Sequence, residues 1–246
     1  LCLIILALAT FYDYGAFASS LAGKRVGKEG SETMALLKWK ASLHNESQTL
    51  ISSWVGSNHC SWVGIGCNKV GCVVHIDFQG YGLKGTHSYL NFSSFTHLLT
   101  LELCNNSLYG TIPPHIGSLW RLTYLSLPLN NLSGTIPTEI GQLTNLRFLY
   151  LNRNPIGGSI PQQIGLLSSL NELGLYTNNL TGSIPSSIGN LGNLTILYLY
   201  DNQLSESIPQ EVGMLRSLVD LELSTNNLTG SIPTYIGNLG LLTTLS

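Results

Sequence analysis

The sequence predicts an α/β repeat solenoid, and three regularities of residues 98–246 support this fold class. Leucines recur every 24 residues, an asparagine follows each complete leucine segment at a fixed place, and an Ile-Pro pair follows each of these asparagines at a constant distance. Self-similarity at a period of about 20–50 residues is the signature of stacked repeats. The regularly spaced leucines are Leu98, Leu122, Leu146, Leu170, Leu194, Leu218 and Leu242.

Each repeat begins with an L-x-x-L-x-L segment, which predicts one short strand. In the repeat at residues 146–169, this segment runs from Leu146 to Leu151. Side chains alternate between the two faces of a strand, so the last two leucines point to one side. A single strand cannot bury them, whereas stacked coils align their strands in a parallel sheet over one continuous core.

An asparagine at a constant place supports the stacking. Its side-chain amide has two donors and an acceptor, which can bond backbone groups of neighbouring coils. Burial without such partners would be costly. We call these residues the Asn ladder: Asn106, Asn130, Asn154, Asn178, Asn202 and Asn226.

Glycine and proline mark the turns of the repeat. A glycine four residues after the ladder asparagine predicts a tight turn that a side chain would obstruct, and Glu206 takes this place in one coil without an explanation in the sequence. Proline forces the preceding residue into an extended conformation. Each Ile-Pro pair therefore predicts a second extended piece beside the main sheet. The IGxL element, as at Ile140 to Leu143, then turns the chain back.

The chain divides into four segments. The first ten residues are apolar but too few to span a bilayer, which needs about 20. Ala16-Phe17-Ala18 follows as a cleavage signature, so we interpret this region as a secretory signal peptide rather than a buried helix. The segments are the N-terminally incomplete signal peptide (1–18), an N-terminal cap (19–72), a degenerate first repeat (73–97) and the 24-residue repeats (98–246), truncated in the seventh.

Charged residues are scarce. They make up 10% of the chain, and the net charge is −2, whereas about 25% is usual in soluble domains. No basic stripe of the kind that binds nucleic acid is present. The histidines lack H-E-x-x-H spacing and no serine lies in a G-x-S-x-G elbow. We therefore expect no nucleic-acid partner, no metal, no cofactor and no catalytic residue in this chain.

The string from Gly80 to Gly85 matches G-x-G-x-x-G, the pattern of nucleotide-binding loops. It falls on the degenerate repeat and does not open a helix in a βαβ unit. The H-R-D and D-F-G segments that a kinase would also need are absent from the sequence. We interpret the string as a turn of the repeat.

The repeat LxxLxxNxLxGxIPxxIGxLxxL resembles the plant-specific class of leucine-rich repeat. The preceding string from Cys60 to Cys67 (CSWVGIGC) is similar to the C-x-W-x-G-[VI]-x-C motif of the N-terminal cap in that family. The resemblance covers residues 31–246. It implies a right-handed superhelix with the parallel sheet on its concave face and a helical cap closed by a Cys60–Cys67 disulfide. Within the cap, the pattern predicts an amphipathic helix over residues 31–43 with Ser31 as its N-cap and with Leu36, Leu37 and Leu43 facing inward.

The other cysteines depart from the family pattern. A zinc site built from Cys60, Cys67 and Cys72 with His59 and His75 is disfavoured, because the spacing is not that of a zinc finger and the compartment is oxidising. Cys72 lies seven residues before the position that aligns with Cys104. An extended path of that length spans roughly 23 Å, which disfavours direct pairing. Free thiols and bonds to a partner are the open alternatives.

The outward positions of the strands predict one recognition surface. Aromatic residues gather on three adjacent coils with acids beside them and one cation near, which is typical of binding surfaces. The alternative is structural, because aromatic neighbours also stabilise a sheet. Gly174 predicts a hollow within the group. The candidate ligand-binding residues are Phe148, Tyr150, Arg153, Tyr176, Tyr198, Tyr200, Asp220 and Glu222.

The sequence also predicts glycosylation, because N-x-S/T sequons become usable behind a signal peptide. The acceptors are Asn45, Asn91, Asn105, Asn131, Asn179, Asn193 and Asn227.

Most proteins that share this resemblance are ectodomains of plant receptor-like kinases. We therefore expect an extracellular, peptide-binding ectodomain at the cell surface or in the apoplast, and no enzyme within this chain. The end at Ser246 in mid-strand indicates a fragment. The resemblance implies a membrane span and a serine/threonine kinase beyond it, with a co-receptor kinase as a further partner. The alternative is a secreted inhibitor of wall-degrading enzymes or a receptor-like protein without a kinase.

Overall fold

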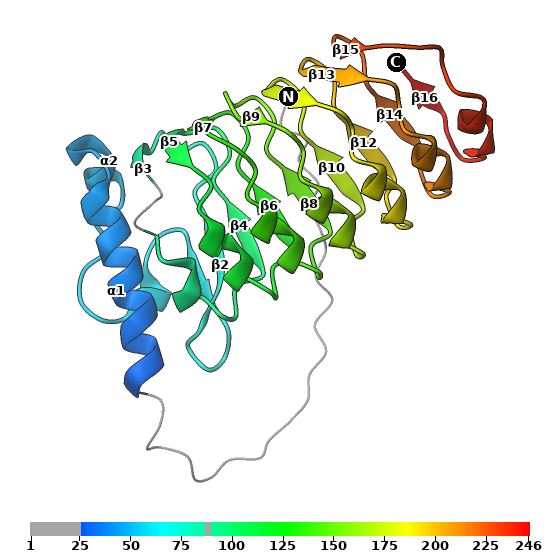
Figure 1. Cartoon of the computed structure of the whole chain (residues 1–246). Helices are drawn as coiled ribbons and strands as arrows, with labels where there is room; N and C mark the ends of the chain where they lie inside the picture. Colours follow the sequence, from blue (N-terminus) through cyan, green and yellow to red (C-terminus); the bar gives the residue numbers. More distant parts are fainter. Residues whose placement is uncertain (1–25, 87–89) are drawn as a thin grey trace, which may run out of the picture.

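A computed structural model describes residues 26–86 and 90–246, so the signal-peptide interpretation of residues 1–18 lies outside the described residues. The chain forms an elongated stack of coils that runs from helix α1 (Val26–Ser42) at one end to the C-terminal coil at the other (Figure 1). Within the described ranges, no helix is both long and apolar enough to cross a bilayer.

The cap is built on helix α1, which begins at Val26 rather than at the predicted Ser31. Ser31 lies inside the helix, and its hydroxyl donates a hydrogen bond to Ser94 Oγ (3.1 Å) in the first turn of the solenoid instead of capping the backbone. Of the three leucines predicted to face inward, Leu36 and Leu43 are buried, whereas Leu37 is only half-buried. Three further short elements complete the cap: α2 (Asn45–Leu50), η1 (His59–Ser61) and β1 (Ile65–Cys67).

Aromatic packing and one disulfide close the open end of the core. The rings of Trp54 and Trp62 stack at a centroid distance of 5.3 Å, and Trp39 meets Phe78 of the first coil edge-on at 5.7 Å. The indole N–H of Trp54 donates to the Val63 carbonyl (2.9 Å), so its polar atom is satisfied in the interior. The expected Cys60–Cys67 disulfide is present (S–S 2.03 Å). A disulfide of this kind contributes typically about 2–4 kcal/mol.

The main sheet has nine strands, which follow one another in chain order as β1-β2-β4-β6-β8-β10-β12-β14-β16. Only the β1–β2 pair is antiparallel among these described strands, and each later pair is parallel with matched register. This confirms the predicted stack of one strand per coil. The strands after β1 are β2 (Val73–Asp77), β4 (Thr100–Glu102), β6 (Tyr124–Ser126), β8 (Phe148–Tyr150), β10 (Glu172–Gly174), β12 (Ile196–Tyr198), β14 (Asp220–Glu222) and β16 (Thr244–Leu245).

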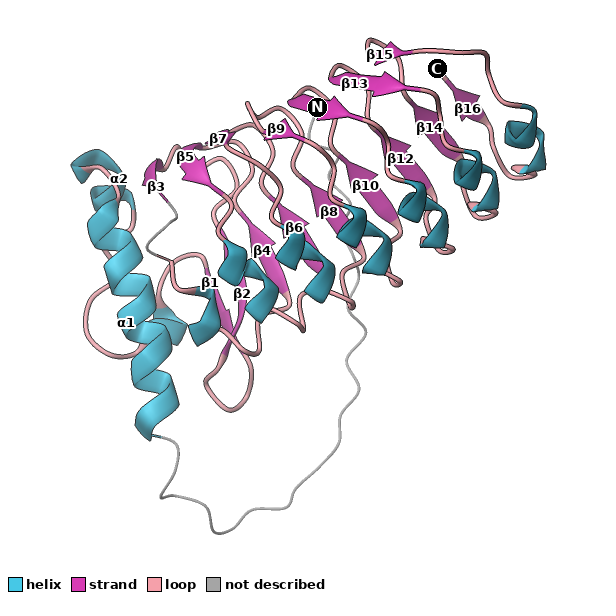
Figure 2. Cartoon of the chain, viewed as in Figure 1, coloured by secondary structure: helices cyan, strands magenta, loops and turns pink. Residues whose placement is uncertain are grey.

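Short strands and 3-10 helices form the two other edges of each coil (Figure 2). One row of strands comprises β3 (Lys84–Thr86), β5 (Ser107–Thr111), β7 (Asn131–Ser133), β9 (Gly157–Gly158), β11 (Asn179–Gly182), β13 (Gln203–Glu206) and β15 (Asn227–Leu228). The 3-10 helices are η2 (Phe92–Ser94), η3 (Pro114–Ser118), η4 (Thr138–Gln142), η5 (Gln162–Leu166), η6 (Ser186–Asn190), η7 (Gln210–Met214) and η8 (Thr234–Asn238).

The second extended piece lies earlier in each coil than the Ile-Pro pairs had predicted. In one coil, β11 ends at Gly182, and Pro185 instead forms the N-cap of η6 (φ −67°, ψ 137°). The physical reason is that proline has no N–H to donate to a strand ladder. The backbone at the pair is extended, as predicted, but it leads into the 3-10 helix.

The Asn ladder joins each coil to the one before it. Asn154 donates from Nδ2 to the carbonyl of Leu127 in the preceding coil (3.0 Å), and its Oδ1 accepts from the backbone N–H of Leu132 (2.9 Å). The same pair of bonds recurs at every ladder position along the described solenoid. The predicted role of these asparagines is confirmed.

Glu206 occupies a backbone conformation that suits glycine. Its φ is +65°, close to the +70° and +74° of Gly158 and Gly182 at the equivalent turns. A non-glycine residue in this left-handed region carries a cost of about 1–2 kcal/mol. The exception in the sequence is therefore a strained turn rather than a different one.

Replacing a ladder residue should destabilise the stack. Asn154→Ala leaves the Leu132 N–H without its partner and removes one of the two side-chain amides that donate to the Leu127 carbonyl. We therefore expect a loss of about 2–3 kcal/mol in the free energy of unfolding. Chemical denaturation measures this loss. The matched variant Asn190→Ala changes an exposed asparagine and should cost less than about 0.5 kcal/mol. Equal losses for both variants would contradict the role of the ladder.

Glu206→Gly should stabilise the protein by about 1 kcal/mol, because it removes the left-handed strain. Glu206→Ala is the control, since alanine retains a Cβ and the same strain. The expected order of melting temperatures in calorimetry is Gly above both Ala and the original Glu. A glycine variant no more stable than the alanine variant would rule out backbone strain at this turn.

Candidate ligand-binding surface

The open face of the main sheet is built by strand alternation. In each three-residue strand from β4 to β14, the middle residue is buried in the core, and the first residue is only half-buried. The matched register aligns these half-buried positions into columns across the sheet. Adjacent strands lie about 4.8 Å apart, so residues in neighbouring coils can touch. From β6 to β14, the first residues of the strands form the first column, which holds Tyr124, Phe148, Glu172, Ile196 and Asp220. The third residues form the second column, which holds Ser126, Tyr150, Gly174, Tyr198 and Glu222.

Three of the predicted tyrosines form one cluster. The rings of Tyr176 and Tyr200 stack at 4.5 Å with an interplanar angle of 12°, and Tyr198 contacts them edge-on at 6.1 and 6.2 Å. The structure therefore brings these residues of adjacent coils together, as the sequence predicted. They are half-buried, so the cluster presents part of each ring to solvent.

A second aromatic cluster includes a residue that the prediction missed. Tyr124 contacts Phe148 at 5.7 Å and Tyr150 at 6.0 Å. The signal that could have identified Tyr124 was its place in the same column as Phe148, one coil earlier. The aromatic surface is therefore wider than the three coils predicted and extends to β6.

Two tyrosine hydroxyls donate hydrogen bonds to carboxylates with the same geometry. Tyr150 in the second column donates to Glu172 in the first column of the next coil, and Tyr198 donates to Asp220 Oδ2 in the same way (2.6 Å). Burial and the neighbouring carboxylates raise the pKa of both phenols above the ordinary range. The hydroxyls therefore stay protonated and fix the rings in place across the strands.

Two acids meet at the C-terminal side of the tyrosines. Burial, and then repulsion by Asp220, raises the pKa of Glu222 above its usual value. Asp220 is also incompletely solvated, because its Oδ1 is buried and accepts no hydrogen bond from any described residue. Negative charge held in this way lacks full compensation within the chain.

The expected hollow at Gly174 is filled by a neighbouring ring. Gly174 is buried, and a Cβ added there would lie 2.9 Å from Cδ1 of Tyr150. The missing side chain allows the Tyr150 ring to lie over the strand and its hydroxyl to reach Glu172. Gly174 is needed for this arrangement, but it provides no cavity of its own.

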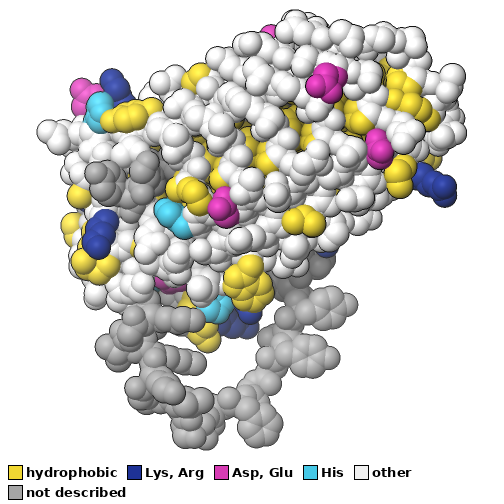
Figure 3. All heavy atoms as spheres, viewed as in Figure 1, with side chains coloured by type: hydrophobic (Ala, Val, Ile, Leu, Met, Phe, Trp, Pro, Cys, Tyr) yellow, Lys and Arg dark blue, Asp and Glu magenta, His cyan; other side chains and the backbone are white. Residues whose placement is uncertain are grey.

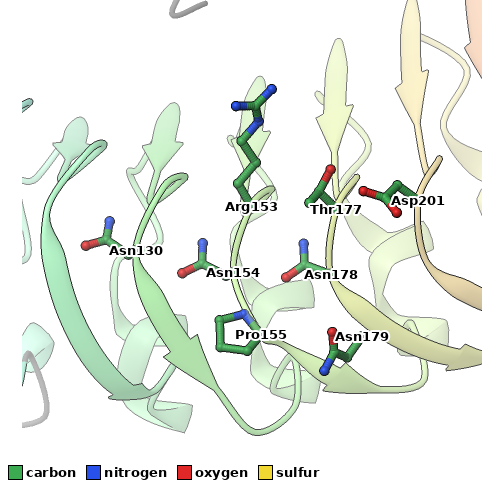
Figure 4. A pocket seen from close by; sticks show the side chains of 8 residues that line it. All are labelled: Asn130, Arg153, Asn154, Pro155, Thr177, Asn178, Asn179 and Asp201. Atoms are coloured by element: carbon green, nitrogen blue, oxygen red, sulfur yellow. The ribbon is translucent and has the colours of Figure 1, made fainter.

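Arg153 lies on the rim where the strands end, and its backbone N–H donates to the Tyr176 carbonyl (3.0 Å). Figure 4 shows Arg153, Thr177 and Asp201 in a row on successive coils above a shallow pocket. All three have left-handed backbones, with φ of 57°, 53° and 57°. The charge of Arg153 acts on the cluster, because it partly offsets the burial that raises the pKa of Tyr200. The complete lining is Asn130, Arg153, Asn154, Pro155, Thr177, Asn178, Asn179 and Asp201.

The position after each strand's last leucine does not always face outward. Cys104 and Asn152 are buried (1% and 5% exposed). Cys72 is a half-buried thiol, and the structure does not join it to Cys104. The sulfurs of Cys60 and Cys67 lie near His59, but their disulfide leaves no thiolate for a metal.

The sequon asparagines all lie on the surface. Each of the seven is exposed, and Asn131, Asn179 and Asn227 begin strands of the second row. Glycosylation stays a prediction.

Charged side chains are sparse across the visible face of the molecule, as Figure 3 shows.

Models of known families match most of the chain. Residues 29–68 match the leucine rich repeat N-terminal domain, and residues 83–226 match the leucine-rich repeat region. A further leucine rich repeat model matches residues 217–239.

Relatives agree with these matches. A probable leucine-rich repeat receptor-like protein kinase of Arabidopsis thaliana is 45% identical over 95 residues, which are 36% of this chain and 8% of that protein. The structure of PEPR1 with AtPEP1 is similar with a TM-score of 0.83 and 34% identity, covering 88% of this chain and 31% of that one. The structure of the Arabidopsis receptor kinase HAESA with the peptide hormone IDA and the co-receptor SERK1 is similar with a TM-score of 0.70 and 32% identity. The match covers 87% of this chain and 41% of the HAESA chain.

The chain spans less than half the length of these relatives. With a matching cap, matching repeats and a similar solenoid, it belongs to the leucine-rich-repeat family, as a plant-class ectodomain similar to those of receptor-like kinases.

Proposed function

We propose that the chain recognises a peptide on its tyrosine surface, which comprises Phe148, Tyr150, Tyr176, Tyr198, Tyr200, Asp220 and Glu222. The observation that supports this most is the combination of half-buried, fixed rings with under-compensated carboxylates on one face of the sheet. Rings of this kind offer contact area at little cost in side-chain entropy. Binding surfaces are enriched in such aromatic anchors.

The dimensions and chemistry of the surface suit an extended peptide. Three strand gaps separate β8 from β14, or about 14 Å, which four or five extended residues would cross. Apolar side chains would pack on the rings. A basic group over Asp220 and Glu222 would offset the repulsion between these acids. Arg153 and Asp201 on the rim could receive a polar flank of the same peptide.

The similar receptor kinase HAESA was solved with the peptide hormone IDA and the co-receptor SERK1, and the similar PEPR1 was solved with AtPEP1. By analogy, this chain would present its peptide at the plasma membrane, on the extracellular side. It would signal through a serine/threonine kinase domain elsewhere in the protein, together with a co-receptor. A secreted inhibitor would instead bind a folded enzyme and would select no short peptide.

Peptide binding can be tested by selecting from a displayed library of random 12-residue peptides on the immobilised protein. We expect enriched peptides to lose at least about tenfold in affinity for the variant Tyr176→Ala/Tyr198→Ala, because two anchors disappear. Tyr109→Ala is the matched control, since this tyrosine is exposed on β5 of the second row. Enriched peptides that bind the double variant and the original chain equally would contradict the proposal.

The acid pair should also show itself in stability. Because the folded-state pKa of Glu222 is raised, the folded chain holds this proton more tightly than the unfolded chain. The group therefore lowers stability as the pH rises above the unfolded value of 4.5. We expect Glu222→Gln to raise the melting temperature by about 1 °C at pH 7 and to leave it unchanged at pH 4. An equal gain at both pH values would exclude a charge effect.

A further inference from the structure

A second hollow on the open face concentrates positive charge. It lies where β6 and β8 begin, at the edge opposite the ladder, and it touches the first column of the sheet. We call it the arginine pocket. Its lining residues are Leu99, Arg121, Thr123, Tyr124, Asn145, Arg147, Phe148 and Ser169.

The placement of the two arginines stands out against the composition of the repeats. Residues 98–246 contain no lysine and only four arginines, Arg121, Arg147, Arg153 and Arg216. Two of these four line the same hollow, and no acidic residue lines it. Of the other acids on the open face, Glu102 lies on the earlier strand β4, and Glu172, Asp220 and Glu222 lie on later strands.

Neither arginine of the pocket is neutralised by an ion pair. Among the described side chains of residues 30–86 and 90–246, the structure contains a single ion pair, between His59 and Glu32 of the cap. An arginine that served only to join coils would be expected to bond a carboxylate on a neighbouring coil. The nearby Glu102 accepts hydrogen bonds from Ser126 and Tyr124 instead, and it does not line the pocket.

The pocket is held in shape from both sides. The guanidinium of Arg121 lies 4.7 Å from the ring centroid of Trp120, a cation–π contact that orients it. The carbonyl of Trp120 accepts from Asn145 Nδ2 (2.8 Å), a lining residue of the next coil. The aromatic wall is the pair of Tyr124 and Phe148, which meet at 5.7 Å.

We propose that the arginine pocket binds a carboxylate that lies next to an aromatic or apolar side chain. A guanidinium matches a carboxylate through paired N–H donors, and the Tyr124–Phe148 wall accepts a ring beside it. The proposal rests on the proposed function, because it names a group that the same peptide would present.

The inference also sets the polarity of the ligand. The acid pair on β14 lies three strand gaps from β8, or about 14 Å, and carries the opposite charge. The ligand class is therefore a short peptide with its anionic group over β6 and β8 and its cationic group over β14. Such complementarity fixes register and disfavours ligands of reversed charge.

The test uses small probes on the full chain, so that it is independent of any selected peptide. N-acetylphenylalanine carries a terminal carboxylate, and the amide of N-acetyl-Phe-Asp carries only a side-chain carboxylate. N-acetylphenylalaninamide has the ring but no charge. Binding is measured by ligand-observed NMR titration at low salt. We expect one or both carboxylates to bind at least about tenfold more tightly than the uncharged amide, and the stronger of the two identifies the source of the group.

The variants Arg121→Gln and Arg147→Gln should each lower the affinity for the carboxylate probe by about tenfold, and added salt should lower this affinity as well. Arg147→Lys keeps the charge and should retain part of the binding, which separates loss of recognition from loss of fold. Arg216→Gln, at an exposed arginine outside the pocket, is the matched control. Equal binding of charged and uncharged probes, or equal losses for Arg147→Gln and Arg216→Gln, would overturn the proposal.

The probe titration and the peptide selection can fail independently of each other. If the probes fail while selected peptides still depend on Tyr176 and Tyr198, the arginine pocket is refuted and the tyrosine surface stands. If the carboxylates bind while no peptide is enriched, the pocket stands and peptide recognition is refuted.

Discussion

The Asn ladder is the interaction on which the rest of the molecule depends. Each ladder side chain bonds a carbonyl of the preceding coil and receives a backbone N–H from it, so a polar group at the centre of the stack is fully used. A buried amide without these partners would cost more than the bonds contribute. The ladder therefore enforces one register from coil to coil, and leucine burial alone would not specify that register.

The candidate site follows from this register. Because every coil repeats at the same height, positions in the short strands align into columns, and a tyrosine in one column can reach an acid in the next coil. The distribution of charge on the open face is then set by the few positions at which the residue differs from coil to coil. The Tyr176–Tyr198–Tyr200 cluster and the acid pair lie on the later coils, whereas Arg121 and Arg147 flank the earlier ones. The leucines and ladder asparagines are shared by the coils, whereas the residues of the candidate site differ between them.

The sequence predicted the repeat, the ladder, the disulfide and the tyrosine cluster, because each depends on spacing within or between identical coils. It failed where side chains choose among contacts. Ser31 reaches Ser94 instead of capping helix α1, and Tyr150 covers Gly174 instead of leaving a hollow. The second row of strands precedes the Ile-Pro pairs, since backbone donors rather than extended geometry decide pairing. The arginine pocket was missed because its residues come from three coils and share no motif.

The central claim is that the open face of the main sheet, rather than either edge of the coils, receives the ligand. Photo-crosslinking tests it most directly, with a selected peptide that carries benzoylphenylalanine at each position in turn, followed by peptide mapping. The account predicts crosslinks within residues 124–222 at strands β6 to β14, at half-buried positions of the open face. Crosslinks confined to the row of β5 to β15 or to the 3-10 helices would contradict it.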